Sequence, residues 1–252
     1  MLLDHDDPVA TAAVEAIRTG DLPALRRLLE DRPALVAARI ASDDGCAQRT
    51  LLHVATDWPG HFPGVAATIA ALVKAGADVN ARFTGKHSET PLHWAASSDD
   101  IDALDALLDA GADIEADGAV IGGGSPLADA RGFAQWSAAR RLLERGARPA
   151  INDAATLGLI DELEAHLATT PPPAPDVITR AFWAACHGGQ LRAAEILLAR
   201  GADLDWLGHG GMTPLDVARA SDAEGLVGRD SAQALLDWLG IRGARSATGP
   251  AR

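Results

Sequence analysis

Two short motifs recur along the chain at a fixed spacing. The stretch TPLHWAA opens at Thr90, and the stretch GADIEA follows it from Gly111. Three pairs of motif positions share this spacing: Thr90 with Gly111, Ser125 with Gly146, and Arg180 with Gly201. Self-similarity at a fixed period is the signature of repeat architectures, in which a unit buries its apolar face only against its neighbours. The chain is therefore predicted to fold as a stack of similar units.

Each repeat reads as two helices followed by a hairpin. Thr90 can cap a helix, and Pro91 suits the first helical position because the N–H it lacks is not needed there. The segment LHWAA is short and Ala-rich, so a second, amphipathic helix such as IDALDALLDA can pack closely against it. Gly111 then ends the second helix in a left-handed conformation. The polar, Gly-containing stretch before the next repeat is expected to form a hairpin.

About seven such repeats are present. Two of them, AVEAIRTGDLPALRRLLEDRPAL and INDAATLGLIDELEAHLATTP, fit the helix–turn–helix pattern without the full motif. The Pro-rich stretch ATTPPPAPD, Ala168–Asp176, is interpreted as a stiff connector inside the domain because the repeat register resumes after it. The predicted organisation is a single domain over 1–245, with an N-terminal capping repeat at 8–37, a C-terminal capping repeat at 213–245, and a disordered tail over 246–252.

These residues resemble the ankyrin repeat. The best matches are TPLHWAA…GADIEA and TPLDVA, with LLHVA…GADVNA and FWAACHGGQLRAAEILLARGADLDW nearly as good. The resemblance covers about residues 8–245 and implies an all-α solenoid with hairpin fingers. It also implies a binding module that presents a concave groove to a protein partner. A fold alone does not specify that partner.

Composition narrows the function classes. The net charge is −13, which disfavours binding to nucleic acids and to anionic membrane surfaces. The N-terminus lacks the features of a secretory signal, and the sequence has no apolar run of membrane-spanning length. The two cysteines, Cys46 and Cys186, are expected to be reduced thiols, which favours a cytoplasmic location. Abundant Ala and Arg with almost no Lys is typical of a bacterial, GC-rich gene.

Several large side chains are assigned to the scaffold. In ankyrin-like repeats, the His of the TPLH motif links neighbouring hairpins by hydrogen bonds, and His53 and His93 occupy that position. Trp183 and Asp216 stand at the equivalent position in later repeats and are also expected to be structural.

Three other residues are assigned to the core. Cys186 occupies a motif Ala position and is expected to be buried and inert. Leu235 and Trp238 fall in the apolar register of the last helix, so both are expected to be buried.

The polar and aromatic residues that the scaffold does not require form the candidate site. They lie four, seven or eight residues after the Thr that begins a repeat, or in nearby hairpins and turns, and should face the concave groove. The candidate binding residues are Asp57, Trp58, His61, Phe83, Lys86, His87, Trp94, Asp99, Phe133 and His187. Aromatic anchors in a concavity are typical of binding sites. The alternative is that these rings only fill gaps between hairpins.

Two function classes remain open at this stage. The first is a non-catalytic module that binds a protein. The second is a small-molecule site or enzyme with a His/Asp/Trp pocket in the repeats spanning 50–133. Lys86 and His87 would give such a pocket positive charge for an anionic ligand, and Trp58 and Trp94 would form apolar walls. The sequence has no diagnostic catalytic spacing, and neither a cofactor nor a metal site is predicted.

Two unusual segments border the candidate site. TDWPGHFPG, Thr56–Gly64, cannot be helical because it contains two Pro and two Gly. It is either a lid over a pocket or an insertion packed on the solenoid. GAVIGGGSPL, Gly118–Leu127, could form an anion-binding nest, or it could simply be a tight hairpin that requires positive φ.

Overall fold

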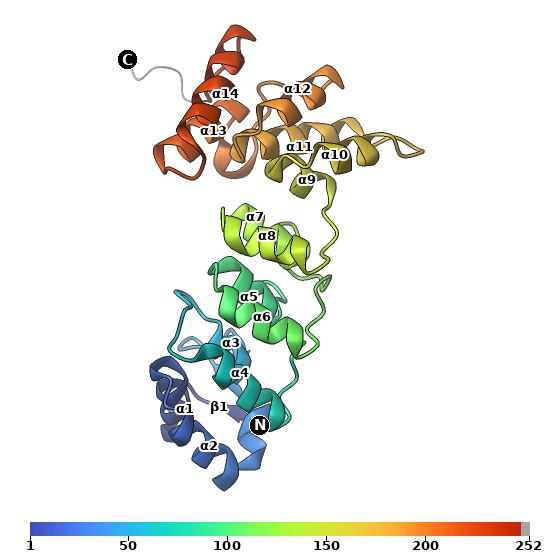
Figure 1. Ribbon diagram of the computed structural model, residues 1–252. Helices are drawn as coiled ribbons and strands as arrows, with labels where there is room; N and C mark the ends of the chain where they lie inside the picture. The colour runs from blue at the N-terminus through green and yellow to red at the C-terminus, as the bar shows by residue number, and fades with distance from the viewer. Residues whose placement is uncertain (248–252) are drawn as a thin grey trace, which may run out of the picture. The chain divides into compact units, whose positions relative to one another are not determined.

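The computed structural model describes residues 1–247, and its contacts divide the chain into two compact units (Figure 1). The first unit, Met1–Arg148, contains the strands β1 (Leu2–Leu3), β2 (Arg39–Ala41) and β3 (Gln48–Thr50), a 3₁₀ turn at Pro33–Ala37, and the helices α1 (Pro8–Thr19), α2 (Leu22–Asp31), α3 (Leu51–Ala55), α4 (Val65–Lys74), α5 (Pro91–Ser97), α6 (Ile101–Asp109), α7 (Pro126–Gly132) and α8 (Trp136–Glu144). The second unit, Pro149–Arg252, contains α9 (Ile151–Leu157), α10 (Ile160–Leu167), α11 (Pro175–His187), α12 (Leu191–Ala199), a 3₁₀ turn at His209–Gly211, α13 (Pro214–Ala223) and α14 (Arg229–Ile241).

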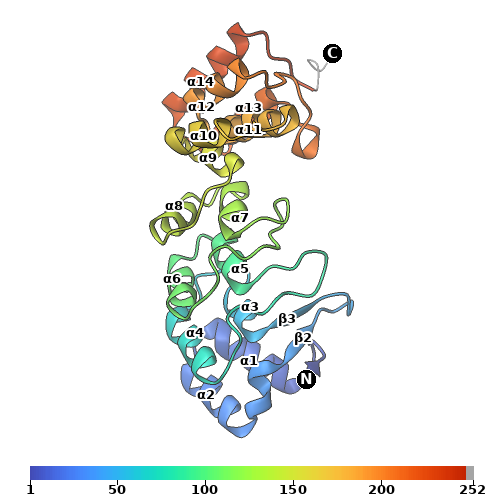
Figure 2. The same ribbon diagram turned by 90° about the vertical axis from the view of Figure 1, so that its right-hand side faces the viewer.

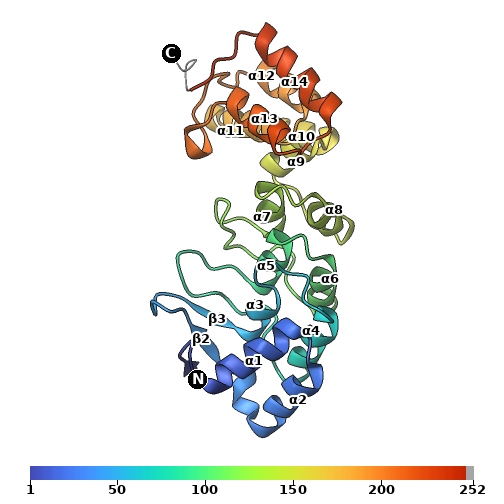
Figure 3. The same cartoon turned by 90° about the vertical axis from the view of Figure 1, so that its left-hand side faces the viewer.

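The helices pair in chain order, from α1 with α2 to α13 with α14. Within residues 1–247 this gives seven helix pairs, which confirms the predicted repeat number. In the first unit, α1, α3, α5 and α7 form one layer, and α2, α4, α6 and α8 form a second layer beside it. Loops and the β2–β3 hairpin extend from the first layer, as two opposite views show (Figures 2 and 3). The second helices and the hairpins therefore offer separate surfaces.

The Thr-Pro-Leu-His motif forms the local structure that the sequence predicts. Thr90 precedes α5 and Pro91 is its first residue. The Thr90 N–H donates to Nδ1 of His93 at 3.1 Å, which leaves the proton of the neutral ring on Nε2. Nε2 then donates to the carbonyl oxygen of Gly124 in the next hairpin, at 3.3 Å. This confirms that the motif His links successive repeats.

The same linkage recurs in other repeats. His53 Nε2 donates to the carbonyl oxygen of Glu89 at 3.1 Å. In the second unit, Trp183 replaces the motif His, and its Nε1–H donates to the carbonyl oxygen of Met212 at 2.9 Å. A buried His and a half-buried Trp thus form the same kind of link between repeats, because each side chain places a ring N–H within hydrogen-bonding distance of a carbonyl oxygen in the next repeat.

A small sheet accompanies the repeats at the N-terminus. β2 pairs antiparallel with β3, and β1 adds to β2 in parallel. The turn between β2 and β3 is held by Asp44, whose carboxylate accepts from the Ser42 hydroxyl at 2.5 Å and from the Cys46 N–H at 2.9 Å. The β2–β3 hairpin is the first of the predicted fingers, whereas the strand at Leu2–Leu3 was not foreseen.

Two predicted details differ from the structure. The connector predicted over Ala168–Asp176 is shorter, because α11 already begins at Pro175, where proline can start a helix without losing a hydrogen bond. Leu235 is buried as predicted, but Trp238 is only half-buried. One part of its ring contacts Phe182, with centroids 6.5 Å apart, and the Arg242 guanidinium lies 5.4 Å from the ring centroid.

The remaining segment predictions concern the loop, the hairpin and the tail. Thr56–Gly64 is non-helical as predicted and connects α3 to α4. The Gly118–Leu127 stretch contains a tight hairpin in which Gly122 and Gly123 have φ of 66° and 71°. The tail predicted over 246–252 lies outside the described residues from position 248 onward. The N–H of Ala247 donates to Asp216 at 2.8 Å, so the start of the tail is anchored.

Candidate functional site

The first unit has a depression with a wall of two aromatic rings. It encloses about 480 Å³ and is called the aromatic depression below. Its lining comes from the N-terminal segment, the β2–β3 hairpin, the following finger and α5: His5, Ile40, Ala41, Ser42, Asp43, Asp44, Ala47, Gln48, Arg49, Phe83 and Trp94. Of the ten candidate residues, Phe83 and Trp94 line this depression.

The aromatic wall is built on the buried motif His. The ring centroids of Phe83 and Trp94 lie 5.2 Å apart with the planes tilted by 55°. His53 packs edge-on against Trp94, with centroids 4.9 Å apart. Both outer rings are half-buried, whereas His53 is fully buried. The pair thus has rigid support from below and keeps apolar surface open to the depression.

Backbone contacts fix the position of Phe83. Its N–H donates to the carbonyl oxygen of Glu89 at 2.7 Å, which closes the finger between them. Thr84 and Gln48 exchange two backbone hydrogen bonds, of 2.7 and 3.0 Å, which join the finger to β3. The Phe83 ring lies over Gly85, where a Cβ would approach the ring to 2.4 Å. A larger residue at this position would force the ring to shift.

Charged groups border the depression on two sides. The acidic tip of the β2–β3 hairpin presents Asp43 and Asp44, and the pKa of Asp44 is lowered by hydrogen bonds from the Ser42 hydroxyl and the Cys46 N–H. On the other side, Arg49 donates to Asp57 at 2.7 Å, and Arg18 donates to the same carboxylate at 3.3 Å. Asp57 is therefore engaged by two guanidinium groups.

Three candidate residues lie instead in the turns between paired helices. Trp58 is 72% exposed in the Thr56–Gly64 loop. His61 donates its N–H to Asp100 at 2.6 Å, and its Nε2 lies 3.1 Å from the carbonyl oxygen of Ser98. Asp99 accepts from the N–H of Ala138 at 2.6 Å, so it caps α8. The contacts of His61 and Asp99 connect each turn to the next one.

The other candidate residues are more dispersed. Lys86 is exposed and His87 is half-buried, both on the finger that carries Phe83. Phe133 is 44% exposed after α7. His187 belongs to the second unit, where it stacks on Trp183 with centroids 5.9 Å apart and its Nδ1 lies 3.2 Å from the Ser221 hydroxyl.

Most of the lining of the aromatic depression was not predicted from the sequence. Ile40, Ala41 and Gln48 belong to β2 and β3, which precede Thr50 and were not included in the motif count. A signal was available in RIASDDGCAQRT, since two short runs flank an Asp-Gly turn, the pattern that favours a β-hairpin.

One carboxyl group is held in an unusual environment. Asp129 is fully buried on α7, and burial raises its pKa to about 6. One oxygen accepts from the Ile121 N–H at 3.0 Å, while the other has no hydrogen-bond partner within residues 1–247. Glu89, which is also buried, adds to this shift through its negative charge. The group supports the Gly118–Gly124 hairpin from beneath.

Cys186 is fully buried, and burial raises the pKa of its thiol. Within residues 1–247, no three His, Cys, Asp or Glu side chains gather in a way that could hold a metal ion. In the same part of the chain, none of the helices has the length and apolar character needed to cross a lipid bilayer.

Comparison with known proteins identifies the repeat. The model of the ankyrin-repeat family matches residues 87–116, which include α5 and α6. Among solved structures, the human ASB11 ankyrin repeat domain matches 98% of this chain and 100% of its own length, at 21% identity and a TM-score of 0.50. The chain has an ankyrin-repeat fold.

For an ankyrin-repeat fold, the general expectation is binding to other proteins through an extended repeat surface. At 21% identity, the likeness to the ASB11 domain concerns the fold alone. A search among curated proteins gave no match to this ankyrin-repeat chain. The binding surface and the kind of partner must therefore be inferred from this chain's own residues.

Proposed function

We propose that this ankyrin-repeat chain is a non-catalytic binding module that holds a segment of another protein in the aromatic depression. The observation that carries the proposal is the Phe83–Trp94 pair, supported by His53 and left half-exposed beside about 480 Å³ of open space. Aromatic side chains in well-supported pockets contribute much of the binding energy at protein interfaces.

The lining favours a segment with one apolar or aromatic anchor. Ile40, Phe83 and Trp94 offer the anchor an apolar surface. The acidic tip at Asp43 and Asp44 favours a basic residue on one side of the anchor. Lys86 and His87, on the neighbouring finger, would favour an acidic residue on the other side.

A small aromatic or anionic ligand is the second candidate. Its support is the volume of the depression, which lies within the roughly 300–1,000 Å³ common for ligand sites. The charged groups first considered for such a ligand are less suited to it. Asp57 is bound to Arg18 and Arg49, and His61 contacts Ser98. The protein-binding proposal therefore has the stronger support.

The proposed location is the cytoplasm. Cys46 is exposed and Cys186 is buried, and both are free thiols. An exposed free thiol suits a reducing compartment, where it would remain unpaired.

The proposal is tested by selecting binding peptides from a random displayed library on the immobilised full chain. Affinities of the selected peptides are then compared between the wild-type chain and the variants Phe83→Ala and Trp94→Ala. We expect each variant to bind at least tenfold more weakly, a loss of about 1.4 kcal/mol. Circular dichroism verifies that each variant is folded.

Trp58→Ala is the matched control, because Trp58 is an exposed aromatic residue outside the aromatic depression. Its affinity for the selected peptides should equal that of the wild type. Peptides whose binding is lost in Trp58→Ala and retained in Trp94→Ala would show that the binding surface lies elsewhere. Tight binding of small aromatic acids, with no selected peptide, would favour the second candidate.

A further inference from the structure

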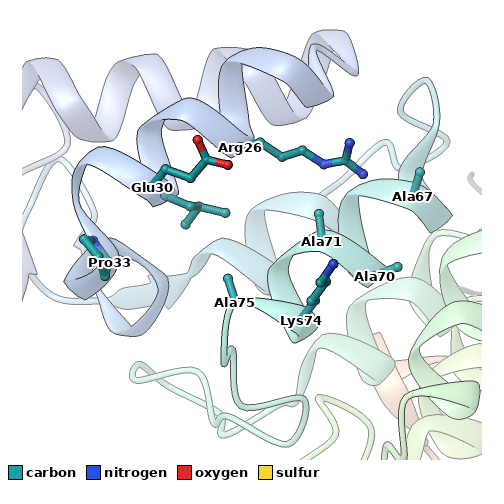
Figure 4. A pocket seen from close by; sticks show the side chains of 9 residues that line it. Arg26, Glu30, Pro33, Ala67, Ala70, Ala71, Lys74 and Ala75 are labelled. Carbon is teal, nitrogen blue, oxygen red and sulfur yellow. The ribbon is translucent and has the colours of Figure 1, made fainter.

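Charged side chains of the first unit lie in two contrasting environments. The groove between α2 and α4 encloses about 670 Å³, and its charged lining residues, Arg26, Glu30 and Lys74, are all exposed and of both signs (Figure 4). Such solvated groups do not select a ligand. Glu89 and Asp129, in contrast, are carboxyl groups with exposed fractions of only 7% and 0%. Burial of a carboxylate is unfavourable unless its charge is compensated.

Each of the two buried carboxyl groups has an oxygen without a hydrogen bond. Oε2 of Glu89 and Oδ2 of Asp129 have no partner within residues 1–247. Both groups belong to segments that hold the hairpin Gly118–Gly124. Ser88, which precedes Glu89 in the finger, donates its N–H to the first carbonyl oxygen of this hairpin at 3.4 Å. Asp129, on α7, accepts from the Ile121 N–H near the hairpin tip at 3.0 Å.

The carboxyl group of Asp129 holds its proton more strongly than usual. Burial raises its pKa to about 6, although the N–H groups of the hairpin backbone act against this rise. The negative charge of Glu89 raises the pKa further, and Arg131, on α7 itself, opposes it. The hairpin tip is therefore held by a group whose charge changes near pH 6.

Two other contacts hold the hairpin at its ends. His93 on α5 donates to the carbonyl oxygen of Gly124 at 3.3 Å, and its ring stays neutral until the pH approaches its pKa of about 4. At the other end, the Arg82 guanidinium lies 2.8 Å from the carboxylate of Asp117. Neither contact involves Asp129, so a charge change at Asp129 acts on the tip alone.

We propose that Glu89 and Asp129 bind one proton between them, and that this proton latches the Gly118–Gly124 hairpin to α7 and to the neighbouring finger. Asp129 Oδ2 takes the proton from solvent and donates it to Oε2 of Glu89, so that both partnerless oxygens gain a hydrogen bond. Asp129 Oδ1 continues to accept from the Ile121 N–H. The pair loses one of its two negative charges in this step.

The latch opens when the proton returns to solvent. Two like charges then lie beside the hairpin, each with an oxygen that lacks a hydrogen bond, and this favours opening of the hairpin to water. Because folding raises the pKa of Asp129 from 3.8 to about 6, its contribution is complete below pH 3.8 and is lost as the pH rises through 6. The latch is therefore closed in acid and released at neutral pH and above.

Release of the hairpin changes an apolar surface of the first unit. Val120, at the hairpin tip, and Phe133, just after α7, are both exposed. The Ile121 side chain lies against Gly132, where a Cβ would approach it to 2.4 Å. Movement of the tip therefore shifts apolar side chains at the surface, so pH alters the surface that this unit presents to other molecules.

The first test is hydrogen exchange of the wild-type chain between pH 5 and pH 8, measured by NMR with rates referenced to the unfolded chain at each pH. The protection factor of the Ile121 N–H should fall at least about tenfold over this range, within the roughly hundredfold limit set by the rise in the pKa of Asp129. The Gly208 N–H, which donates to Met212 in a hairpin of the second unit, is the internal control and should keep its protection factor. A protection factor of Ile121 that does not change with pH would overturn the proposal.

Two substitutions separate the latch from a general effect of charge. Asp129→Asn keeps an oxygen that can accept from Ile121 and an N–H that can donate to Glu89, but it has no titrating proton. At pH 8, its Ile121 N–H should reach the protection factor that the wild-type chain has at pH 5. Asp117→Asn is the matched control, because this carboxylate stands at the base of the same hairpin and is 84% exposed, and it should keep the wild-type pH dependence. Retention of that pH dependence in a folded Asp129→Asn chain would also overturn the proposal.

The titration of Asp129 tests the sharing of the proton. The NMR chemical shift of its carboxyl carbon should change with a midpoint near pH 6. Glu89→Gln should lower this midpoint by about half a pH unit or more, because loss of the like charge and gain of an amide donor both favour the ionised form of Asp129. A wild-type midpoint near pH 4, or a midpoint that Glu89→Gln leaves unchanged, would show that the two carboxyl groups do not share a proton.

Discussion

The two units of this ankyrin-repeat chain use their aromatic residues in different ways. In the first unit, Phe83 and Trp94 stand half-exposed beside a depression, and Trp58 and Phe133 are exposed. In the second unit, Phe182 is fully buried at the centre of the core cluster, with Trp183 and Trp238 packed against that cluster. The same repeat pattern therefore leaves aromatic rings at the surface of the first unit and packs them into or against the core of the second unit. Rings that are not needed for packing remain available for binding.

The largest effect is expected where a ring serves packing. Phe182→Ala should lower the free energy of unfolding of the second unit by about 4 kcal/mol, because it removes a fully buried ring and leaves a cavity. Urea denaturation followed by circular dichroism measures the loss. The first unit, which has its own core, should keep its transition. A loss below about 1 kcal/mol would mean that the second unit does not depend on Phe182 for packing.

The second effect concerns acid, because the two units contain different groups with shifted pKa values. Burial lowers the pKa of His53 and His93 from 6.5 to about 4 in each case. Their neutral forms therefore stabilise the fold fully above pH 6.5, and this contribution is lost as the pH falls toward 4. Asp129 acts in the opposite sense, since its raised pKa favours the fold below pH 3.8 and this contribution is lost as the pH rises through 6.

The net expectation is that the first unit loses about 3 kcal/mol of its free energy of unfolding between pH 7 and pH 4.

In the second unit, the carboxyl group of Asp216 has a pKa below its usual value. Partial burial opposes ionisation of its carboxyl, but hydrogen bonds from Ser246, Ala247 and Thr213 outweigh it and lower the pKa to about 2. Its contribution is complete above pH 3.8. Hydrogen exchange resolved by peptide, with rates referenced to the unfolded chain at each pH, should show the first unit opening first. Earlier opening of the second unit would contradict this prediction.

The third prediction compares the same substitution, Asp to Asn, at one position in each unit. Asp129→Asn should stabilise the chain by about 1–2 kcal/mol at pH 8 and by nearly nothing at pH 4, because it removes a buried carboxylate that ionises only at a cost. Asp216→Asn should instead destabilise it by about 1 kcal/mol at pH 7, a value discounted because the half-exposed carboxylate is screened by solvent. Urea denaturation of both variants provides the measurement. Effects of the same sign would refute the contrast.

The smallest effect is expected at an exposed ring of the first unit. Trp58→Ala should change the free energy of unfolding by less than about 0.5 kcal/mol, since Trp58 is 72% exposed and substitutions at such surface positions are usually near neutral. Thermal unfolding measures this change. A loss above about 1.5 kcal/mol would show that the ring packs on the repeats in solution, and the Thr56–Gly64 loop would then be part of the scaffold.

The repeat architecture could be predicted from the sequence because it depends on local chemistry. Thr90 and Pro91 start a helix wherever they stand, and glycine after the second helix adopts a conformation that other residues avoid. The motif His53 and His93 bind the next repeat through contacts whose geometry follows from the repeat itself. Stacking of like units then follows from the shared apolar faces, so the number of helix pairs was accessible as well.

The candidate site could be predicted only in part from the sequence, because it depends on which fingers contact each other in the folded unit. Phe83 and Trp94 could be assigned to one surface from their repeat positions, but the β2–β3 hairpin that completes the depression came from a stretch without the motif. His61 and Asp99 were chosen as free polar groups. The structure pairs them with the next turn through contacts to residues far along the chain.

The sequence by itself determined the helices, their caps, the repeat number and the links between neighbouring repeats, because each rests on interactions over one turn or one repeat. Tertiary structure alone decided which side chains stay exposed together. The aromatic depression needs the pairing of Gln48 with Thr84, which joins the finger that carries Phe83 to β3. Exposure and charge balance depend on the whole packed unit, since a side chain is free only when no distant segment covers it.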